Sequence, residues 1–335
     1  MNEPARAVVV TAPHHVEVST VQLAELGSRD ILIRTLFSGV STGTDKWVMQ
    51  GRFTWNALRF PLVPGYQRFG VIEALGSDVT GFHIGQEVVA TASQPFSDAD
   101  AAWGGHVSLA VSSSDEVYDA TGIDPSRASL FVSAQVGFNA ASRIPQVESQ
   151  RVVVYGDGII GVSGALAAKA RGFAVLLVGR HPERMEPLAD LDIEAVRSGD
   201  DSASVLRRWM PTAVIDTVQS DDAFDEYVDA LPLRTGQIVF SGHSPGGTTA
   251  WGDMERMQQN ELTASFVSGW TPDRVKGTLQ LMRTGQLPVE RFAVLVPGSE
   301  IASTMQTVAE GRLRPVAAVL DWRSSTRLTP RPTPR

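Results

Sequence analysis

The sequence predicts an α/β protein in which a β-rich domain is followed by a doubly wound parallel sheet. Its 335 residues, 43% of them hydrophobic, are enough for two domains with buried cores. Up to about residue 120, short runs of valine, isoleucine and threonine are broken by glycine, aspartate and proline, which is typical of half-buried strands. From about residue 150, apolar runs alternate with helical patterns, which indicates a parallel sheet.

The individual elements follow from the same patterns. The β-rich part contains five runs that predict strands, at residues 5–10, 14–20, 30–40, 68–76 and 86–91. The second part opens with a strand at 151–155, a helix at 162–172 and a strand at 174–179. The remaining expected strands are at 212–218, 236–242, 291–297 and 314–322, and the remaining expected helices at 221–232, 273–285 and 300–311.

Composition and charge limit the classes of partner. The net charge is −8 and no basic stretch is long, so we expect no nucleic-acid binding. The absence of cysteine excludes disulfides and thiolate metal sites. No apolar stretch is long enough for a signal peptide or a transmembrane helix, so we expect a cytoplasmic protein with a small-molecule substrate and no membrane partner. Residues 324–335 are rich in proline, arginine and threonine and are expected to be disordered.

A glycine motif after the strand at 151–155 predicts a dinucleotide site. Gly156, Gly158 and Gly161 have the spacing G-x-G-x-x-G, and the motif precedes a helix and a second buried strand. The first glycine permits a tight turn, the second lets the backbone approach a pyrophosphate, and the third lets the helix pack closely. Ile159 and Ile160 begin that helix, where free N–H groups attract phosphate. The alternative is a glycine-rich turn without a ligand.

The end of the second strand bears on the choice between NAD and NADP. A site for NAD usually has an aspartate or glutamate about 20 residues after the glycines, where it binds the ribose 2′-hydroxyl. The matching position here is Gly179, followed by Arg180 and, after a short interval, Arg184. Because a guanidinium pairs well with phosphate and no carboxylate is found at that position, we predict NADPH as the cofactor. The alternative is that both arginines are solvated residues at a helix start.

Three segments carry a resemblance to a known superfamily: FPLVPGYQRFGVIEALGSDVTGFHIGQEVVA, AWGGHVSLAV and SGWTPDRVKGTLQLMRTGQL. Along nearly its whole length the chain resembles the medium-chain dehydrogenase/reductase superfamily. The resemblance implies a GroES-like catalytic domain at residues 1–133, with 267–323 returning to it, and a Rossmann domain at 134–266. SGVSTGTD followed by FPLVPGY resembles the branch that includes bacteriochlorophyllide hydroxyethyl dehydrogenases.

The zinc ligands of that superfamily are missing. Ser41 stands where zinc-containing relatives have a ligand cysteine, and Gly-Tyr-Gln, with Tyr66 and Gln67, stands where they have Gly-His-Glu. The third ligand position falls near Val132 or Ser133. A catalytic zinc needs three good nitrogen, sulfur or oxygen donors, so we predict an enzyme that works without zinc.

Without zinc, hydroxyl groups are the candidates for supplying a proton to the reacting oxygen. Tyr66 replaces a zinc ligand and could donate a hydrogen bond or a proton to a carbonyl oxygen. Ser41 and Thr44 stand where relatives have a ligand and a proton-relay hydroxyl. Turn and helix-start chemistry is an equally good explanation for the hydroxyls of the STGTD segment. Asp45 is expected to have a structural hydrogen-bonding role.

Other residues are candidates for substrate and nicotinamide contact. Trp47, Arg52 and Trp55 belong to an aromatic and polar insertion before FPLVPGY that could line a substrate cleft, and packing is the alternative for each tryptophan. Gln67 is a further candidate for substrate contact. By resemblance, Trp270 lies near the substrate cleft. The resemblance also implies that the segment after the apolar run GQIVF (236–240) runs beside the nicotinamide, namely Ser241, Gly242 and His243.

Together these observations predict an NADPH-dependent, zinc-independent oxidoreductase that interconverts a ketone and a secondary alcohol. The acidic chain and the polar insertion favour a sugar-like or aminosugar intermediate, as in aminoglycoside deoxygenation. The alternatives are a hydroxyethyl-tetrapyrrole dehydrogenase, an enoyl or quinone reductase, and a non-catalytic NADPH-binding protein. The resemblance also implies a homodimer.

Overall fold

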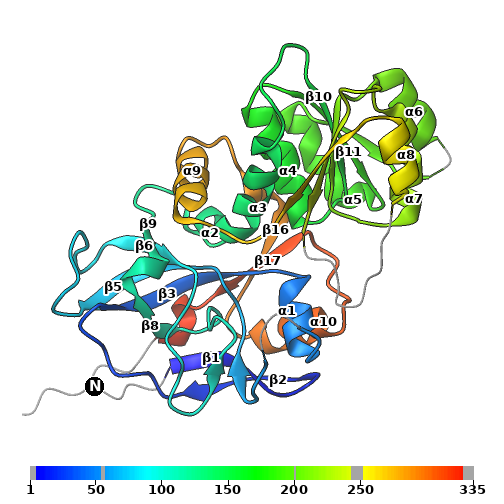
Figure 1. Cartoon of the computed structure of the whole chain (residues 1–335). Coiled ribbons are helices and arrows are strands. Elements are labelled where there is room, and N and C mark those ends of the chain that lie inside the picture. Colours follow the sequence, from blue (N-terminus) through cyan, green and yellow to red (C-terminus); the bar gives the residue numbers. More distant parts are fainter. Residues whose placement is uncertain (1–4, 54–56, 200, 243–251, 327–335) are drawn as a thin grey trace, which may run out of the picture. The chain divides into compact units, whose positions relative to one another are not determined.

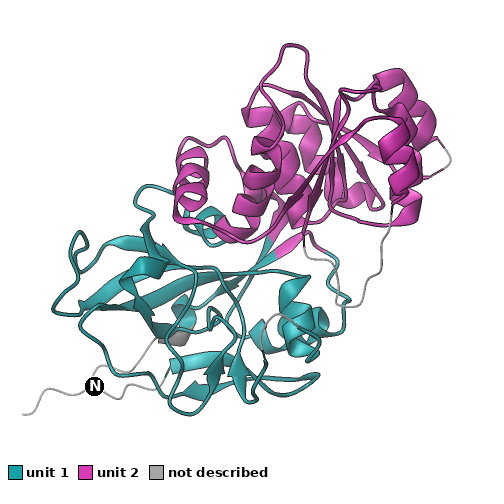
Figure 2. Cartoon of the chain, in the orientation of Figure 1, with its two compact units in different colours: residues 1–130, 294–314, 318–335 teal, residues 131–293, 315–317 magenta. Residues whose placement is uncertain are grey.

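The computed structural model describes residues 5–53, 57–199, 201–242 and 252–326 (Figure 1). The chain divides into two compact units (Figure 2): unit 1 comprises residues 1–130, 294–314 and 318–335, and unit 2 comprises residues 131–293 and 315–317. Residues 267–293, expected in the catalytic domain, therefore belong to unit 2. The reason is that their helix packs on the first helix of unit 2, where a Cβ added at Gly277 would lie 3.0 Å from Phe138.

Unit 1 is built from two sheets. The larger has the order β16-β17-β3-β5-β6-β9, with β8 also paired to β3, and the smaller has the order β2-β1-β4-β7. All five strands expected in the β-rich part are present. The strands are β1 (Ala5–Ala12), β2 (His15–Val21), β3 (Asp30–Val40), β4 (Leu62–Val63), β5 (Arg68–Leu75), β6 (Glu87–Ala90), β7 (Asp100–Ala101), β8 (Leu109–Ser113), β9 (Val117–Asp119), β16 (Ala293–Val296) and β17 (Ala317–Asp321).

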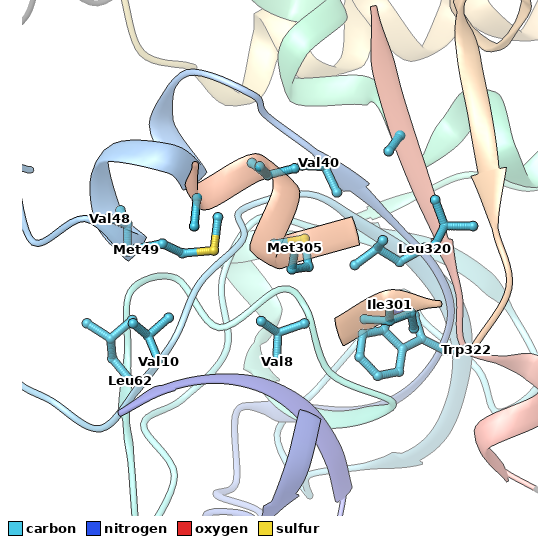
Figure 3. Close-up of a cluster of buried hydrophobic side chains, with 14 of the residues drawn as sticks. Val8, Val10, Val40, Val48, Met49, Leu62, Ile301, Met305, Leu320 and Trp322 are labelled. Carbon is cyan, nitrogen blue, oxygen red and sulfur yellow. The ribbon is translucent and has the colours of Figure 1, made fainter. Parts of the chain in front are cut away.

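Both ends of the chain contribute to the core of unit 1. Figure 3 shows Val8 from β1 and Met49 packed in one cluster with Met305, Leu320 and Trp322 from the C-terminal part. Each such buried side chain contributes about 1.5–3 kcal/mol through the hydrophobic effect. The helices of this unit are α1 (Thr44–Met49), α2 (Pro125–Ala128), α10 (Ile301–Ala309) and the short 3-10 helices η1 (Ser114–Glu116) and η5 (Arg323–Thr326).

Unit 2 is a doubly wound parallel sheet with the order β12-β11-β10-β13-β14-β15. In Figure 1, α3 and α4 lie on one side of this sheet and α6, α7 and α8 on the other. Ligands of such sheets bind where the strand order reverses, which here is at the carboxyl ends of β10 and β13. The strands are β10 (Arg151–Tyr155), β11 (Ala174–Gly179), β12 (Glu194–Arg197), β13 (Ala213–Asp216), β14 (Gln237–Ser241) and β15 (Thr263–Val267).

The helices of unit 2 include several that the sequence pattern did not indicate. They are α3 (Phe131–Ser142), α4 (Ile159–Ala170), α5 (Pro182–Met185), η2 (Glu186–Leu191), α6 (Ser202–Trp209), α7 (Asp221–Tyr227), η3 (Val228–Ala230), α8 (Met254–Gln259), α9 (Pro272–Arg283) and η4 (Val289–Phe292). Helix α3 was missed because it is buried nearly all round, so no exposed polar face reveals its period. Among the described residues, no helix is long and apolar enough to span a bilayer.

Candidate functional site

The glycine turn between β10 and α4 leaves one glycine facing open space. Gly156 has a φ of +113°, and a Cβ there would lie 2.2 Å from the Thr217 hydroxyl oxygen. A Cβ at Gly161 would lie 1.9 Å from the Gly156 carbonyl oxygen. A Cβ at Gly158 would meet nothing within 4 Å. The outer two glycines are therefore required by the fold, whereas Gly158 keeps space free beside the backbone, as a pyrophosphate site needs.

The N-terminus of α4 offers hydrogen-bond donors at the same place. Gly158 is its N-cap and supplies no side-chain acceptor. The carbonyl of Gly158 accepts the first helical hydrogen bond, from the Val162 N–H at 2.9 Å. The N–H groups of Ile159, Ile160 and Gly161 precede that bond and have no acceptor within the helix. Together with the positive end of the helix dipole, they favour a bound anion.

The end of β11 differs from the sequence-based expectation, because a carboxylate does occupy the space beside Gly179. A Cβ at Gly179 would lie 2.6 Å from the Asp157 Cβ and 2.9 Å from its Oδ2. Asp157 is the residue between the first two motif glycines. An acidic residue at position 179 would not fit, because the Asp157 side chain already fills the space where its side chain would lie. Position 179 itself carries no carboxylate, as the sequence indicated, but the argument did not include Asp157, which lies beside it.

The Asp157 carboxylate is held by two neighbouring residues. The His181 backbone N–H and ring Nδ1 lie 2.7 and 2.9 Å from Oδ2, and Arg184 Nη1 lies 3.3 Å from Oδ1. Burial acts to raise the pKa of Asp157, but these hydrogen bonds and positive charges outweigh it and the pKa is lowered. Arg184 is thus paired with a carboxylate, while Arg180 is exposed at the surface.

The other residues assigned to nicotinamide or substrate in unit 2 follow β14 and β15. Ser241 is buried, and its carbonyl accepts a hydrogen bond from Gln219 Nε2 at 3.0 Å. Gly242 has a φ of +102°, which favours glycine at the end of this strand. His243 lies outside the described residues. Trp270 is half-buried and comes directly before α9.

In unit 1, an aspartate rather than a hydroxyl holds the STGTD turn. The Ser41 N–H donates to Asp45 Oδ2 at 2.8 Å, and the Asp45 N–H donates to the Ser41 carbonyl at 3.0 Å. The N-cap of α1 is Gly43, and it makes no side-chain cap. The hydroxyls of Ser41 and Thr44 therefore do not cap α1. Ser41 is buried, and Thr44 is half-buried.

The same aspartate belongs to a buried chain of hydrogen bonds. Trp322 Nε1 lies 2.9 Å from Ser38 Oγ, which lies 2.9 Å from His106 Nδ1. His106 Nε2 lies 3.2 Å from Asp45 Oδ2. All four side chains are 0–1% exposed. Since the indole can only donate, Trp322 donates to the Ser38 hydroxyl, Ser38 can donate to His106 Nδ1, and Nε2–H can donate to Asp45.

Tyr66 is positioned by the segment that carries His106. The Gly105 N–H donates to the Gly65 carbonyl at 2.7 Å, and a Cβ at Gly65, whose φ is +96°, would lie 2.7 Å from the imidazole. The Tyr66 and Trp103 rings meet edge to face with their centroids 5.5 Å apart. Tyr66 is 8% exposed, so its ring has little freedom and its direction is fixed by packing.

The donor set does not fit zinc. The positions of the family's ligands hold a serine hydroxyl, a phenol and an amide, and the amide of Gln67 is fully buried. The third position falls on buried Val132 or Ser133. No group of three histidine or acidic side chains suitable for a metal occurs in the part of the chain that the structure describes. No step of the chemistry is therefore assigned to a metal.

The aromatic and polar insertion of unit 1 is only partly described. Trp47 is half-buried on α1, and the Lys46 ammonium lies 6.0 Å from its ring centroid. Arg52 is exposed, and its backbone N–H donates to the Trp47 carbonyl at 2.8 Å. Trp55 lies outside the described residues.

The predicted site residues are divided between the two units. Ser41, Thr44 and the residues around Tyr66 belong to unit 1, whereas the glycine turn, Arg180 and Arg184 belong to unit 2. Sequence reasoning missed His106, because its partner Asp45 is 61 residues away and nothing local links them. Asp157 could have been noticed, since it lies inside the glycine motif.

Comparisons with known proteins agree with this fold. The alcohol dehydrogenase GroES-like domain family matches residues 27–122. The chain is 25% identical over 330 residues to a 2-desacetyl-2-hydroxyethyl bacteriochlorophyllide A dehydrogenase of Cereibacter sphaeroides, covering 95% of this chain and 98% of that protein. It is 25% identical over 291 residues to the L-galactonate-5-dehydrogenase of Escherichia coli K12, covering 79% and 83%.

A solved structure gives the same result for the whole architecture. A protein from Sinorhizobium meliloti 1021, described as a zinc-binding dehydrogenase and bound to NADP, superposes with a TM-score of 0.81 at 16% identity and covers 95% of this chain and 99% of that one. At this identity the likeness concerns the fold. The predicted combination of a GroES-like domain and a Rossmann sheet is confirmed.

Proposed function

The chain belongs to the medium-chain dehydrogenase/reductase superfamily and is an oxidoreductase of that type, and from this premise we propose that it uses NADPH, without zinc, to interconvert a ketone and a secondary alcohol. The observation that carries the proposal is the glycine turn of unit 2, where Gly158 faces open space at the N-terminus of α4. This arrangement suits the pyrophosphate of a nicotinamide dinucleotide.

The preference for NADPH is supported by charge at the end of β11. Arg180 is exposed directly after the strand, and Gly179 leaves no room for an acidic side chain of its own. Asp157 fills that space, but its charge is paired with His181 and Arg184. A 2′-phosphate would therefore meet a region with net positive charge, and NADP is also the ligand of the dehydrogenase from S. meliloti.

The side chains of unit 1 would act on the substrate oxygen. NADPH, when bound, supplies the hydride. Tyr66, fixed against Trp103, would donate a hydrogen bond to the carbonyl oxygen as negative charge develops on it. Ser41 and Thr44 are the alternative donors, because neither hydroxyl caps α1. Gln67 and Trp47 would contact the rest of the substrate.

A polar, sugar-like substrate is the class we favour, including an aminosugar intermediate such as those of aminoglycoside deoxygenation. The relative from E. coli is named for a sugar acid, and Arg52 and the half-buried Trp47 of unit 1 suit a polyhydroxylated ring. A second candidate is a hydroxyethyl-tetrapyrrole, because the relative from C. sphaeroides spans nearly the whole chain and is named for that activity.

We also propose that the protein forms a homodimer. β15 is an edge strand of the parallel sheet, and Phe266 on it is 77% exposed. A large apolar side chain on an exposed sheet edge favours pairing with another chain. Sedimentation analysis should give twice the mass of one chain, and Phe266→Lys should shift it toward the monomer.

Turnover assays test the proposed function. Polar ketones, an acetyl/hydroxyethyl tetrapyrrole pair, enones and quinones should be compared with NADPH and with NADH. We expect reduction of a ketone with NADPH, and Arg180→Ala should weaken NADPH binding while leaving NADH nearly unchanged. Turnover of enones or quinones alone would identify a double-bond or quinone reductase, and binding of NADPH without any turnover would favour a non-catalytic protein.

A further inference from the structure

The carboxylate beside the end of β11 has almost no hydrogen-bonding capacity left for a ligand. Asp157 Oδ2 receives two donors from His181, and Oδ1 receives one from Arg184. The side chain is 9% exposed. Of the about four acceptor sites of a carboxylate, a ribose hydroxyl could use only the one left on the largely buried Oδ1, where it would compete with Arg184.

Two further arginines lie around it. Arg180 is exposed directly after β11, and the neighbouring His181 side chain is 39% exposed. Arg197 ends β12, is paired in register with Gly179, and is also exposed. Glu183, exposed on α5, is the nearest acidic residue in sequence. With the charge of Asp157 compensated by Arg184, the exposed part of this region is positive.

The packing explains why the acidic group comes from the turn and not from the strand. Met185 Sδ and the Asp157 Cβ would lie 2.8 and 2.6 Å from a Cβ at Gly179. Because Gly179 has no side chain, it leaves room for the Asp157 side chain. The Asp157 carboxylate accepts a hydrogen bond from the His181 backbone N–H and so holds the backbone in place where it leaves β11. The direction of the backbone after Gly179 determines where the Arg180 and His181 side chains lie.

We propose that Asp157 is a positioning residue for cofactor selection, which holds His181 and Arg184 at the end of β11 so that the arginines there receive the 2′-phosphate of NADPH. This inference rests on the proposed NADPH dependence and assigns it to a residue of the glycine motif. An aspartate in this place would ordinarily be taken as a ribose acceptor or as a repellent to phosphate. Here its buried carboxylate, which already accepts three hydrogen bonds, organises the positive charge instead.

The experiment is a fluorescence titration of the full-length protein with NADPH and with NADH. Asp157→Asn keeps the size of the side chain, but its amide group offers a donor where three donors already converge. We expect the Kd for NADPH to rise about tenfold or more, the usual effect of losing a charge-assisted hydrogen bond, and the Kd for NADH to change about twofold or less. Gly179→Ala, which pushes Asp157 away without altering its charge, should act in the same direction.

The matched control is Asp192→Asn. Asp192 is a carboxylate of the same unit, 95% exposed, and paired with Lys169. This variant should leave both dissociation constants unchanged. A combined Asp157→Asn/His181→Ala variant should lose little more NADPH affinity than either single variant, because the two residues act as one group.

Three outcomes would overturn the inference. Tighter NADPH binding by Asp157→Asn would mean that the carboxylate repels the phosphate. A selective loss of NADH would make it a ribose acceptor. Equal losses for both cofactors would reduce it to a structural role. If the wild-type protein prefers NADH, the proposed NADPH dependence fails, but a selective loss of NADPH binding in Asp157→Asn would still support the positioning role.

Discussion

Replacing Asp45 by alanine should destabilise unit 1 strongly. The carboxylate accepts from the Ser41 N–H at 2.8 Å and from His106 Nε2 at 3.2 Å, and Asp45 and His106 are no more than 1% exposed. The substitution would leave both donors buried without an acceptor. Each such donor costs about 1–3 kcal/mol.

The net effect follows from a balance of these costs with one gain. Two stranded donors amount to about 2–6 kcal/mol. Removing a buried carboxylate relieves part of its desolvation cost, and Asp45 Oδ1 accepts no hydrogen bond among the described residues, so nothing is lost there. We therefore expect a loss of about 2–4 kcal/mol, which lowers the melting temperature of a unit of this size by roughly 10 °C.

Urea and thermal unfolding followed by circular dichroism measure this loss. Asp45→Asn retains an acceptor oxygen and should lose less. In a double-mutant cycle with His106→Leu, the coupling energy should reach about 1 kcal/mol or more, because both residues belong to one hydrogen-bond chain. A loss below about 0.5 kcal/mol for Asp45→Ala, or strictly additive effects, would refute the buried network.

The remaining predictions concern the reaction, the metal and acid stability. Tyr66→Phe should lower kcat by about 10²–10⁴-fold with cofactor affinity intact, and normal turnover with a collapse in Ser41→Ala or Thr44→Val would move the donor to the STGTD turn. Exhaustive chelation should leave activity unchanged, and a stoichiometric zinc whose removal abolishes turnover would contradict the donor set at Ser41, Tyr66 and Gln67. Although burial acts to raise the pKa of Asp157, its hydrogen bonds and cations lower it, so this carboxylate stabilises the fold above about pH 4 and that stability is lost as the pH falls through its lowered value. Asp157→Asn should therefore flatten the decline of the melting temperature in acid, and an unchanged acid profile would show that the pair with His181 contributes nothing.

The sequence was most informative where a local pattern has a single structural outcome. The strands at Asp30–Val40, Arg151–Tyr155 and Ala174–Gly179 were predicted with the bounds that the structure has, because runs of β-branched residues between turn residues suit few other conformations. The glycine motif was equally informative. Its spacing has meaning only between a strand and a helix, and both were evident from the pattern.

The hydrophobic pattern did not predict helices or strands whose two faces are about equally buried or equally exposed. Helix α3 has apolar or small residues on all sides, and β12 and β15 are short edge strands with mixed exposure. The return of the chain was placed at residue 267 instead of 294 for a related reason. The segment belongs to unit 2 because α9 packs on α3. Neither the sequence of α9 nor that of α3 indicates which helix it packs against.

By itself, the sequence determined the class of fold and the position of the glycine turn between β10 and α4, since each depends on residue type and short spacing. Only the tertiary structure decided which side chains share hydrogen bonds. It brought His106 to Asp45 across 61 residues, and it placed Asp157 in the space beside Gly179. The physical reason is that the state of a carboxylate depends on the donors that surround it after folding, so one aspartate can be a repellent, an acceptor or an organiser of cations according to its neighbours.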